Sequence, residues 1–258
     1  MLSLRKLSLA TLVAFTALGG CSSPPPATPP PAATYIGVSP PYADQAFAWL
    51  AGFGDQDPLH ELTLLVLPTQ DGLDGVEAGE LAFMITSAEP PVAWFATPLS
   101  KEPIFVAVSP GVAPGDLDLE ALNAIFAGRV HDWAELEAAA SPVQPIVYPA
   151  GDELRQSFES QVMGNSRISS NALLAPNPAA MSELLLGENG AIGFLPGPEL
   201  PSGLRPLKLD GAAPSRSMVE SGRYPLTVTI LAVAMEEPAG LARTWLGWIQ
   251  AQPDTPQP

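Results

Sequence analysis

Two adjacent carboxylates, Asp152 and Glu153, follow Gly151 at the start of a predicted helix, in the stretch YPAGDELRQSF that begins at Tyr148. The first turn of a helix is a natural anion site, because free backbone N–H groups and the positive end of the helix dipole meet there. Here the residues at that position are themselves anionic. The stretch therefore predicts either a binding site of unusual preference or a site that its own side chains have closed.

We favour the second interpretation. Asp152 is a good N-cap residue, and Glu153 would lie on the positive end of the dipole, so that the two carboxylates fill the position that a ligand would use. Arg155 is expected to pair with Glu159, four residues further on. Direct contact of Asp152 and Glu153 with a ligand stays open as the alternative.

Other residue patterns that carry chemistry are missing from the sequence. His60 and His131 are its only histidines, neither has a partner at metal-ligand spacing, and His131 is expected in a surface turn. The chain has one cysteine and no Gly-x-Ser-x-Gly motif. We therefore expect no metal, no cofactor and no enzymatic activity.

The N-terminus predicts export. Arg5 and Lys6 precede an apolar run, Leu7 to Leu18, that is too short to span a bilayer comfortably. The following Gly-Gly-Cys21 resembles a bacterial lipobox, which predicts a signal peptide over residues 1–20 and lipidation at Cys21. An ordinary signal peptide with an incidental cysteine is the alternative. We expect an extracytoplasmic protein, anchored by lipid to a bacterial membrane at the cell surface or in the periplasm.

A Pro-rich tract over residues 21–33 predicts an extended tether, and residues 251–258 a disordered tail. The net charge of −16 would become −18 on loss of Arg5 and Lys6 with the signal peptide. Such a field repels nucleic acid, and no basic stripe interrupts it. An overall negative charge does not exclude an anionic ligand that is held by local N–H groups.

Between these ends the pattern alternates between strands and helices, which favours an α/β fold with parallel strands. Apolar strands are expected at 34–38, 61–68, 81–87, 103–110, 145–150, 191–196 and 224–235. The strand at 61–68 is rich in Leu and Val and is expected to be buried. Helices are expected at 43–53, 69–80, 118–127, 152–163, 179–188 and 238–250. The buried face of the first helix could be Ala43, Phe47 and Leu50, or Ala46, Trp49 and Phe53.

Four segments of the second half resemble periplasmic phosphate-binding proteins, the solute-binding components of phosphate ABC importers. They match in order and spacing. The matching residues are Ile125, Phe126, Gly128, Arg129 and Trp133; Phe158 and Gly164; Asn189 to Phe194; and Tyr224 to Leu226. The resemblance implies a two-lobed type 2 periplasmic-binding-protein fold with the ligand cleft between the lobes. It places lobe 1 at 34–102 and 223–250, and lobe 2 at 103–222.

The resemblance also implies where a ligand would bind. The family holds phosphate with N–H groups and hydroxyls from loops at the carboxyl ends of strands. The corresponding residues here are Ser39 and Tyr42 in the first loop, Thr69 and Gln70 in the second, and Ser87 in the third. Each of them could equally be a helix cap or a turn residue.

The fourth loop departs from the family's pattern of an arginine, two variable residues and Gly-Ser-Gly-Thr-Arg. Tyr148 stands for the first arginine, while Gly151 and Arg155 are kept. Asp152 and Glu153 replace serine and glycine, and the threonine is replaced by leucine. A charged phosphate beside two carboxylates would meet repulsion of a few kcal/mol from each, at about 4 Å and an effective dielectric near 20. The altered loop argues against phosphate as the ligand.

Two functions are expected from the resemblance and the altered loop. The first is a monomeric solute-binding protein that closes on phosphate, another small oxyanion or a small molecule and delivers it to an ABC permease. The second is a surface lipoprotein that keeps the fold as a sensor or interaction module and has lost anion binding.

Overall fold

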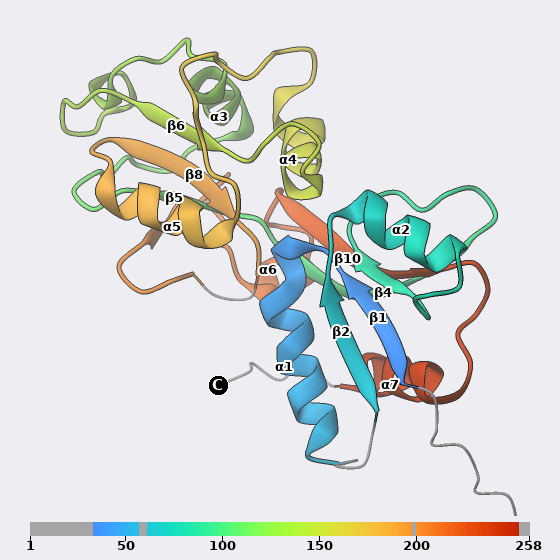
Figure 1. The fold of residues 1–258 in the computed structure, drawn as a ribbon. Helices are drawn as coiled ribbons and strands as arrows, with labels where there is room; N and C mark the ends of the chain where they lie inside the picture. The colour runs from blue at the N-terminus through green and yellow to red at the C-terminus, as the bar shows by residue number, and fades with distance from the viewer. Residues whose placement is uncertain (1–32, 57–60, 198–199, 253–258) are drawn as a thin grey trace, which may run out of the picture. The chain divides into compact units, whose positions relative to one another are not determined.

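The computed structural model describes residues 33–56, 61–197 and 200–252 (Figure 1). The predicted signal peptide, Cys21, nearly all of the tether, His60 and most of the tail lie outside the described residues. The described residues form an α/β structure, as predicted. Each of its two sheets is mixed, because antiparallel pairs accompany the parallel strands that the sequence favoured. We call the part built on the first sheet lobe 1 and the part built on the second sheet lobe 2.

Lobe 1 contains a five-stranded sheet in the order β2-β1-β3-β10-β4. Its strands are β1 (Thr34–Val38), β2 (Leu62–Val66), β3 (Met84–Thr86), β4 (Phe95–Pro103) and β10 (Thr227–Ala234). Its helices are α1 (Ala43–Gly54), α2 (Thr69–Glu77) and α7 (Gly240–Ala251). β1 pairs in parallel with both β2 and β3, so the carboxyl ends of all three strands meet at one edge of the sheet.

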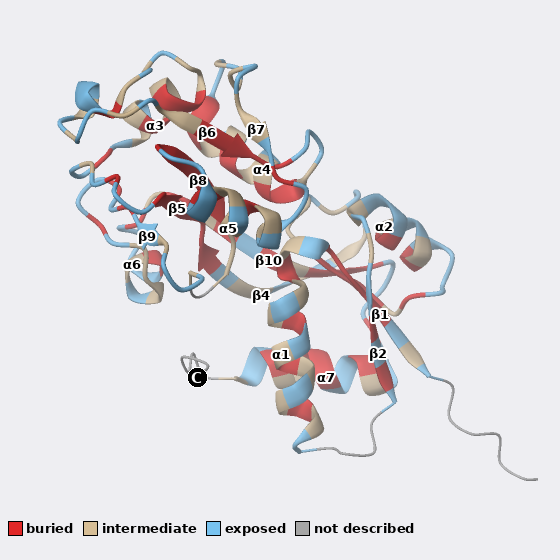
Figure 2. Ribbon diagram, turned by 60° about the vertical axis from the view of Figure 1, so that its left-hand side comes forward, coloured by how far each residue is buried: buried red, intermediate tan, exposed pale blue. Residues whose placement is uncertain are grey.

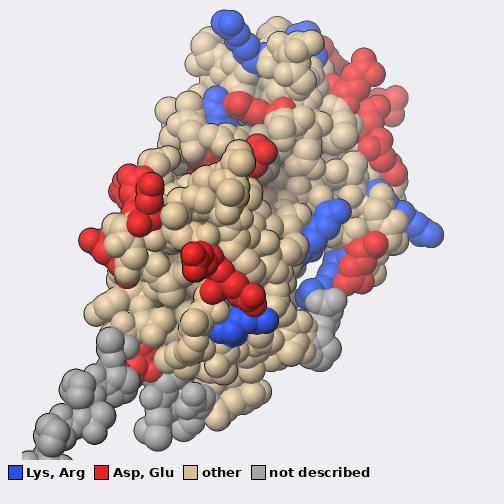
Figure 3. Space-filling model, turned by 90° about the vertical axis from the view of Figure 1, so that its right-hand side faces the viewer, with Lys and Arg blue, Asp and Glu red and all other residues tan. Residues whose placement is uncertain are grey.

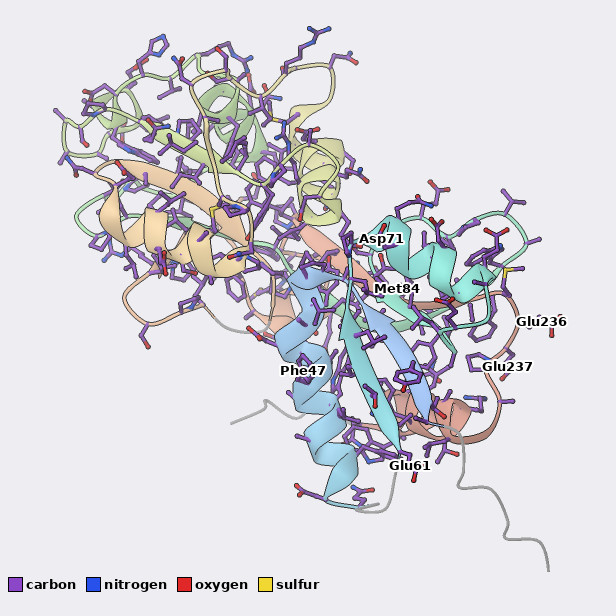
Figure 4. All side chains as sticks on the ribbon, viewed as in Figure 1. Phe47, Glu61, Asp71, Met84, Glu236 and Glu237 are labelled. Carbon is purple, nitrogen blue, oxygen red and sulfur yellow. The ribbon has the colours of Figure 1, made fainter. Side chains whose placement is uncertain are left out.

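Helix α1 buries Ala46, Trp49 and Phe53, which decides between the two faces that the sequence allowed. Phe47 is 47% exposed and is labelled on α1 in Figure 4. Helix α2 packs closely on the sheet because Gly72 has no side chain: a Cβ there would lie 2.4 Å from the Met84 sulfur. This close packing holds the start of α2, with Thr69, at the carboxyl edge of the sheet.

The two lobes are joined through β4 and β10, which pair antiparallel along their lengths. The chain passes from the first sheet to the second between Pro103 and Phe105. It returns between α6 (Arg216–Glu220) and β10. The Tyr224 hydroxyl donates a 2.9 Å hydrogen bond to the Ile104 carbonyl, which ties the returning segment to the outgoing one.

Lobe 2 contains the second five-stranded sheet, in the order β7-β6-β8-β5-β9. Its strands are β5 (Phe105–Val108), β6 (Gln144–Val147), β7 (Leu173–Leu174), β8 (Ala191–Leu195) and β9 (Arg205–Pro206). Besides α6, its helices are α3 (Leu119–Phe126), α4 (Glu153–Phe158) and α5 (Pro178–Gly187). Asp118 caps α3 as predicted, and one π-helical turn (Glu159–Met163) continues α4 up to Gly164.

Buried residues are concentrated in the strands and on the helix faces that cover them (Figure 2). In lobe 2, Phe158 and Phe194 stack at 4.1 Å between ring centroids, and Phe126 packs against both edge to face. The Trp133 indole N–H donates to the Gly190 carbonyl at 2.9 Å. The family-like motif residues of lobe 2 therefore include much of its core.

Three predictions need correction. β2 was expected to be buried, yet Leu65 and Val66 are exposed, because β2 is an edge strand of the sheet. β4 is absent from the strands that the apolar pattern predicted. The strand expected at 81–87 is shorter, Met84–Thr86.

The surface and the helices add two findings. On the face drawn in Figure 3, Asp and Glu side chains form several separate groups, with Lys and Arg side chains between them. Among the described helices, none combines the length and apolarity that a membrane span requires.

Candidate anion site

Hydroxyl and backbone N–H donors from lobe 1 converge at the carboxyl edge of its sheet. Thr69 begins α2, just after β2, and Thr86 ends β3. Ser87 and Ala88 follow Thr86 directly and add backbone N–H groups and one more hydroxyl. We call the donor groups of these four residues the anion site.

The Glu153 carboxylate occupies the anion site. Its Oε2 atom accepts hydrogen bonds from the Thr86 hydroxyl and the Ser87 N–H, both at 2.5 Å, and from the Ala88 N–H at 2.9 Å. The Ser87 hydroxyl lies 3.1 Å from the same oxygen. The Thr69 hydroxyl donates to Oε1 at 3.4 Å. One carboxylate from lobe 2 therefore satisfies donors from two loops of lobe 1.

Burial makes this contact energetically important. Glu153 is only 4% exposed, and a carboxylate without partners in such a position would carry a large desolvation penalty. Charge-assisted hydrogen bonds from hydroxyls and N–H groups offset that penalty. A second anion in the same place would lose these donors to Glu153 and would meet its negative charge at short range.

Asp152 caps α4, as predicted. Its Oδ1 atom accepts a 3.0 Å hydrogen bond from the Arg155 N–H. Burial raises the pKa of the Asp152 carboxyl, the negative charge of Glu153 raises it further, and the hydrogen bond from Arg155 offsets part of the rise. Glu153 was expected to rest on the dipole end of the helix; it begins α4, but its side chain crosses to lobe 1 instead.

Arg155 also lies as predicted. Its Nε atom donates to the Glu159 carboxylate at 2.7 Å, and its guanidinium donates to the Tyr148 carbonyl at 2.8 Å. Both contacts are inside lobe 2. In this conformation Arg155 braces the loop that carries Asp152 and Glu153.

Tyr148, at the position of the family's arginine, is part of the lobe 2 core. Its ring packs edge to face on Phe194, with 5.4 Å between centroids, and the side chain is fully buried. Among the described residues its hydroxyl has no hydrogen-bond partner. Burial raises the pKa of Tyr148, so the group stays neutral and brings no positive charge to the anion site.

The other residues predicted for the site lie around it. The Ser39 hydroxyl donates to the Ile85 carbonyl, and the Tyr42 hydroxyl donates to the Ser87 hydroxyl at 2.7 Å. Gln70 turns away and donates to Asp74. Gly151 has a φ of 96°, a left-handed conformation that favours glycine, and it lets the chain turn into α4.

Two donors of the anion site, Thr86 and the Ala88 N–H, were not among the residues singled out from the sequence. Both lie in the third loop, beside the predicted Ser87. A hydroxyl at the last position of a buried strand was the signal available for Thr86. Elsewhere in the described chain, no group of three or more His, Cys, Asp or Glu side chains is placed to hold a metal ion.

A family model, described as a PBP superfamily domain, matches residues 25–252. The chain belongs to the PBP superfamily. A curated relative, the phosphate-binding protein PstS of Bacillus subtilis, is 22% identical over 147 residues, or 57% of this chain. The match spans about half the length of that relative, 49%.

Solved structures show the same fold. A protein of Clostridium perfringens, assigned as a phosphate ABC transporter substrate-binding protein and solved with phosphate bound, matches with a TM-score of 0.76 at 17% identity. The match covers 84% of this chain and 92% of that one. An ABC-type phosphate transport receptor of Vibrio cholerae matches with a TM-score of 0.69 at 17% identity, over 85% and 94% of the two chains. The resemblance to phosphate-binding proteins and the predicted two-lobed fold are thereby confirmed.

Proposed function

We propose that the chain is an extracytoplasmic solute-binding protein, anchored by lipid at Cys21, whose ligand is not free phosphate. Its fold is that of phosphate-binding proteins named as ABC transporter components. This kinship supports an ABC permease as the membrane partner. The relatives are named for binding rather than for catalysis, which supports a protein without enzymatic activity.

The single observation that carries the ligand part of this proposal is the position of Glu153. Its carboxylate accepts the hydrogen bonds that lobe 1 offers to an anion, and it is almost completely buried. Phosphate would have to displace a carboxylate that the chain itself holds in the site, so that each phosphate ion competes with an intramolecular contact. Tyr148 stands where the family has an arginine, so no positive charge from that position would offset the charge of a bound phosphate.

The same carboxylate also favours a second candidate, a non-transport lipoprotein that keeps the fold as a sensor or interaction module. A permanent contact between Glu153 and lobe 1 would hold the two lobes together without a ligand. In the first candidate the lobes open and close on a solute, so that the Glu153 contact forms and breaks. Hydrogen exchange at the Ser87 and Ala88 amides separates the two: slow exchange without ligand favours the module.

Calorimetry on the purified protein with phosphate, sulfate and molybdate tests the proposal. We expect no heat of binding up to millimolar concentrations of each anion. Micromolar binding of phosphate would overturn the claim that Glu153 has closed the anion site. The lipid anchor is tested separately with Cys21→Ala. The protein is made in cells that process lipoproteins and is then extracted with a phase-separating detergent. The substitution should move it from the detergent phase to the aqueous phase.

A further inference from the structure

A cavity of about 410 Å³ lies beside the anion site and is lined by both lobes. Lobe 1 contributes the start of α1 with Tyr42, and lobe 2 contributes the start of α5 and the end of β8. The joining strands close its floor with Glu102 of β4 and Ile230 of β10. Its volume falls in the range of small-molecule sites, about 300–1,000 Å³.

Tyr42 belongs both to the lining of this cavity and to the surroundings of the anion site. It lines the cavity, and its hydroxyl donates to the Ser87 hydroxyl, which in turn contacts Glu153. A solute in the cavity would therefore touch both lobes without competing with Glu153. Contact with both lobes at once is what a solute needs in order to stabilise their closed arrangement.

The polar groups of the cavity suit a cation. Among the described residues that line it, the two charged ones are Asp44 and Glu102, both acidic. Glu102 is only 5% exposed. Burial raises the pKa of its carboxyl, and the Arg216 guanidinium offsets part of that rise while also pairing with Glu220 at 3.3 Å. A buried carboxylate gains most from a positive group that is brought next to it.

Two helices begin at the cavity, and their dipoles alone would favour an anion. Prolines weaken that option, because Pro40, Pro41 and Pro178 have no N–H to offer. At the start of α5 the Ala179 N–H follows Pro178, and the Ala180 N–H is already bound to the Asn177 side chain. These two helix starts therefore offer an anion fewer N–H donors than helix starts without proline do.

Apart from Gln45, Asn177 and Ser182, which are polar and uncharged, most of the remaining lining is apolar. Five prolines line the cavity together with the Tyr42 ring, Leu195 and Ile230. An ammonium or guanidinium group near Glu102 would leave the body of the solute against these walls. Electrostatic steering favours the same class of ligand, since the whole chain carries a net charge of −16.

We propose that this cavity binds a small organic cation with an apolar body, held by Glu102 and Asp44. The proposal rests on the proposed function in one respect, that the chain is a solute-binding protein; it names the class of solute. It does not depend on whether Glu153 excludes phosphate.

Choline, putrescine and agmatine are the probes, titrated into the purified full-length protein by calorimetry, with glucose and phosphate as neutral and anionic comparisons. At least one cation should bind with submillimolar affinity, and glucose should not. Glu102→Gln should weaken that binding by about tenfold or more. Glu183→Gln, which removes an exposed carboxylate on α5 outside the cavity, should leave it unchanged.

Ala179→Trp provides an independent test, because a large ring at this lining position should fill the cavity and abolish cation binding. The Ala179→Trp variant also tests the proposal if the Glu102→Gln protein does not fold. Failure of all three cations to bind, equal binding by glucose, or cation binding unaffected by both variants would overturn the proposal. Phosphate binding to the wild-type protein would overturn the proposed function instead, so the two failures are distinguishable.

Discussion

Glu153 and Thr86 lie 67 positions apart in the chain and are joined by a 2.5 Å hydrogen bond between lobe 2 and lobe 1. The bond places a carboxylate where lobe 1 gathers its anion donors. From the sequence, the start of α4 looks like an anion site that carries two carboxylates of its own. In the structure, one of these carboxylates, that of Glu153, pairs with donors of lobe 1.

Removal of the carboxylate should destabilise the protein. Glu153→Ala leaves the Thr86 hydroxyl and the Ser87 and Ala88 N–H groups without their acceptor, which should lower the free energy of unfolding by about 3 kcal/mol. Urea unfolding measures the change. Glu89→Ala, which removes an exposed carboxylate one residue beyond Ala88, should change it by less than about 0.5 kcal/mol. Equal losses in the two variants would show that Glu153 has no special role.

Removal of both carboxylates should reopen the anion site. In the double variant with Asp152→Ser and Glu153→Gly, the lobe 1 donors are free and the nearby negative charges are gone. Phosphate should then raise the melting temperature, because a ligand that binds only the folded state stabilises it. Asp152→Ser alone keeps Glu153 and should show no response. A phosphate response in the single variant would place the obstacle at Asp152.

The raised pKa of Asp152 predicts a pH dependence. Since burial raises this pKa above the ordinary value of 3.8, the folded state binds the proton more tightly than the unfolded state. The stability that Asp152 contributes is therefore fully present below its ordinary pKa and is lost as the pH rises through its folded-state pKa. Asp152→Asn keeps the cap without the charge.

Relative to wild type, Asp152→Asn should be more stable at neutral pH, and the difference should shrink to a constant small value in acid. Unfolding of both proteins between pH 3 and pH 7 measures this trend, within the usual range for carboxyl titrations. A difference that grows as the pH falls would mean that the pKa of Asp152 is lowered in the folded state.

The Tyr224 hydroxyl adds a buried hydrogen bond to the connection between the lobes. Tyr224→Phe removes the hydroxyl that donates to the Ile104 carbonyl and should cost about 1 kcal/mol of stability. Tyr35→Phe is a matched control, because Tyr35 is 42% exposed. Thermal unfolding of the two variants compares them, and an equal effect would argue that the buried hydrogen bond contributes nothing.

Much of the fold could be predicted because its signals are local. The Asp118 and Asp152 caps and the glycine stops are recorded in the sequence within a few residues of the structures they form. The missed strand β4 shows the limit of such signals. Its prolines, Pro98 and Pro103, argue against a central strand, but β4 lies at the edge of its sheet, where a missing N–H is tolerated.

The anion site was predicted only in part, for a different reason. Ser87 and Thr69 were singled out because the family resemblance implies that residues in loops at the carboxyl ends of strands hold the ligand. The direction of the Glu153 side chain depends on how lobe 2 meets lobe 1, and no local pattern records that. The core position of Tyr148 could not be predicted for a similar reason, because its ring packs on Phe194, 46 residues further along the chain.

A crystal structure of the protein grown in a high concentration of phosphate would show directly whether Glu153 closes the anion site. We expect Glu153 Oε2 to lie within hydrogen-bond distance of the Ser87 and Ala88 N–H groups, with no phosphate in the anion site. A phosphate ion bound to those N–H groups, with the Glu153 side chain turned away, would contradict it.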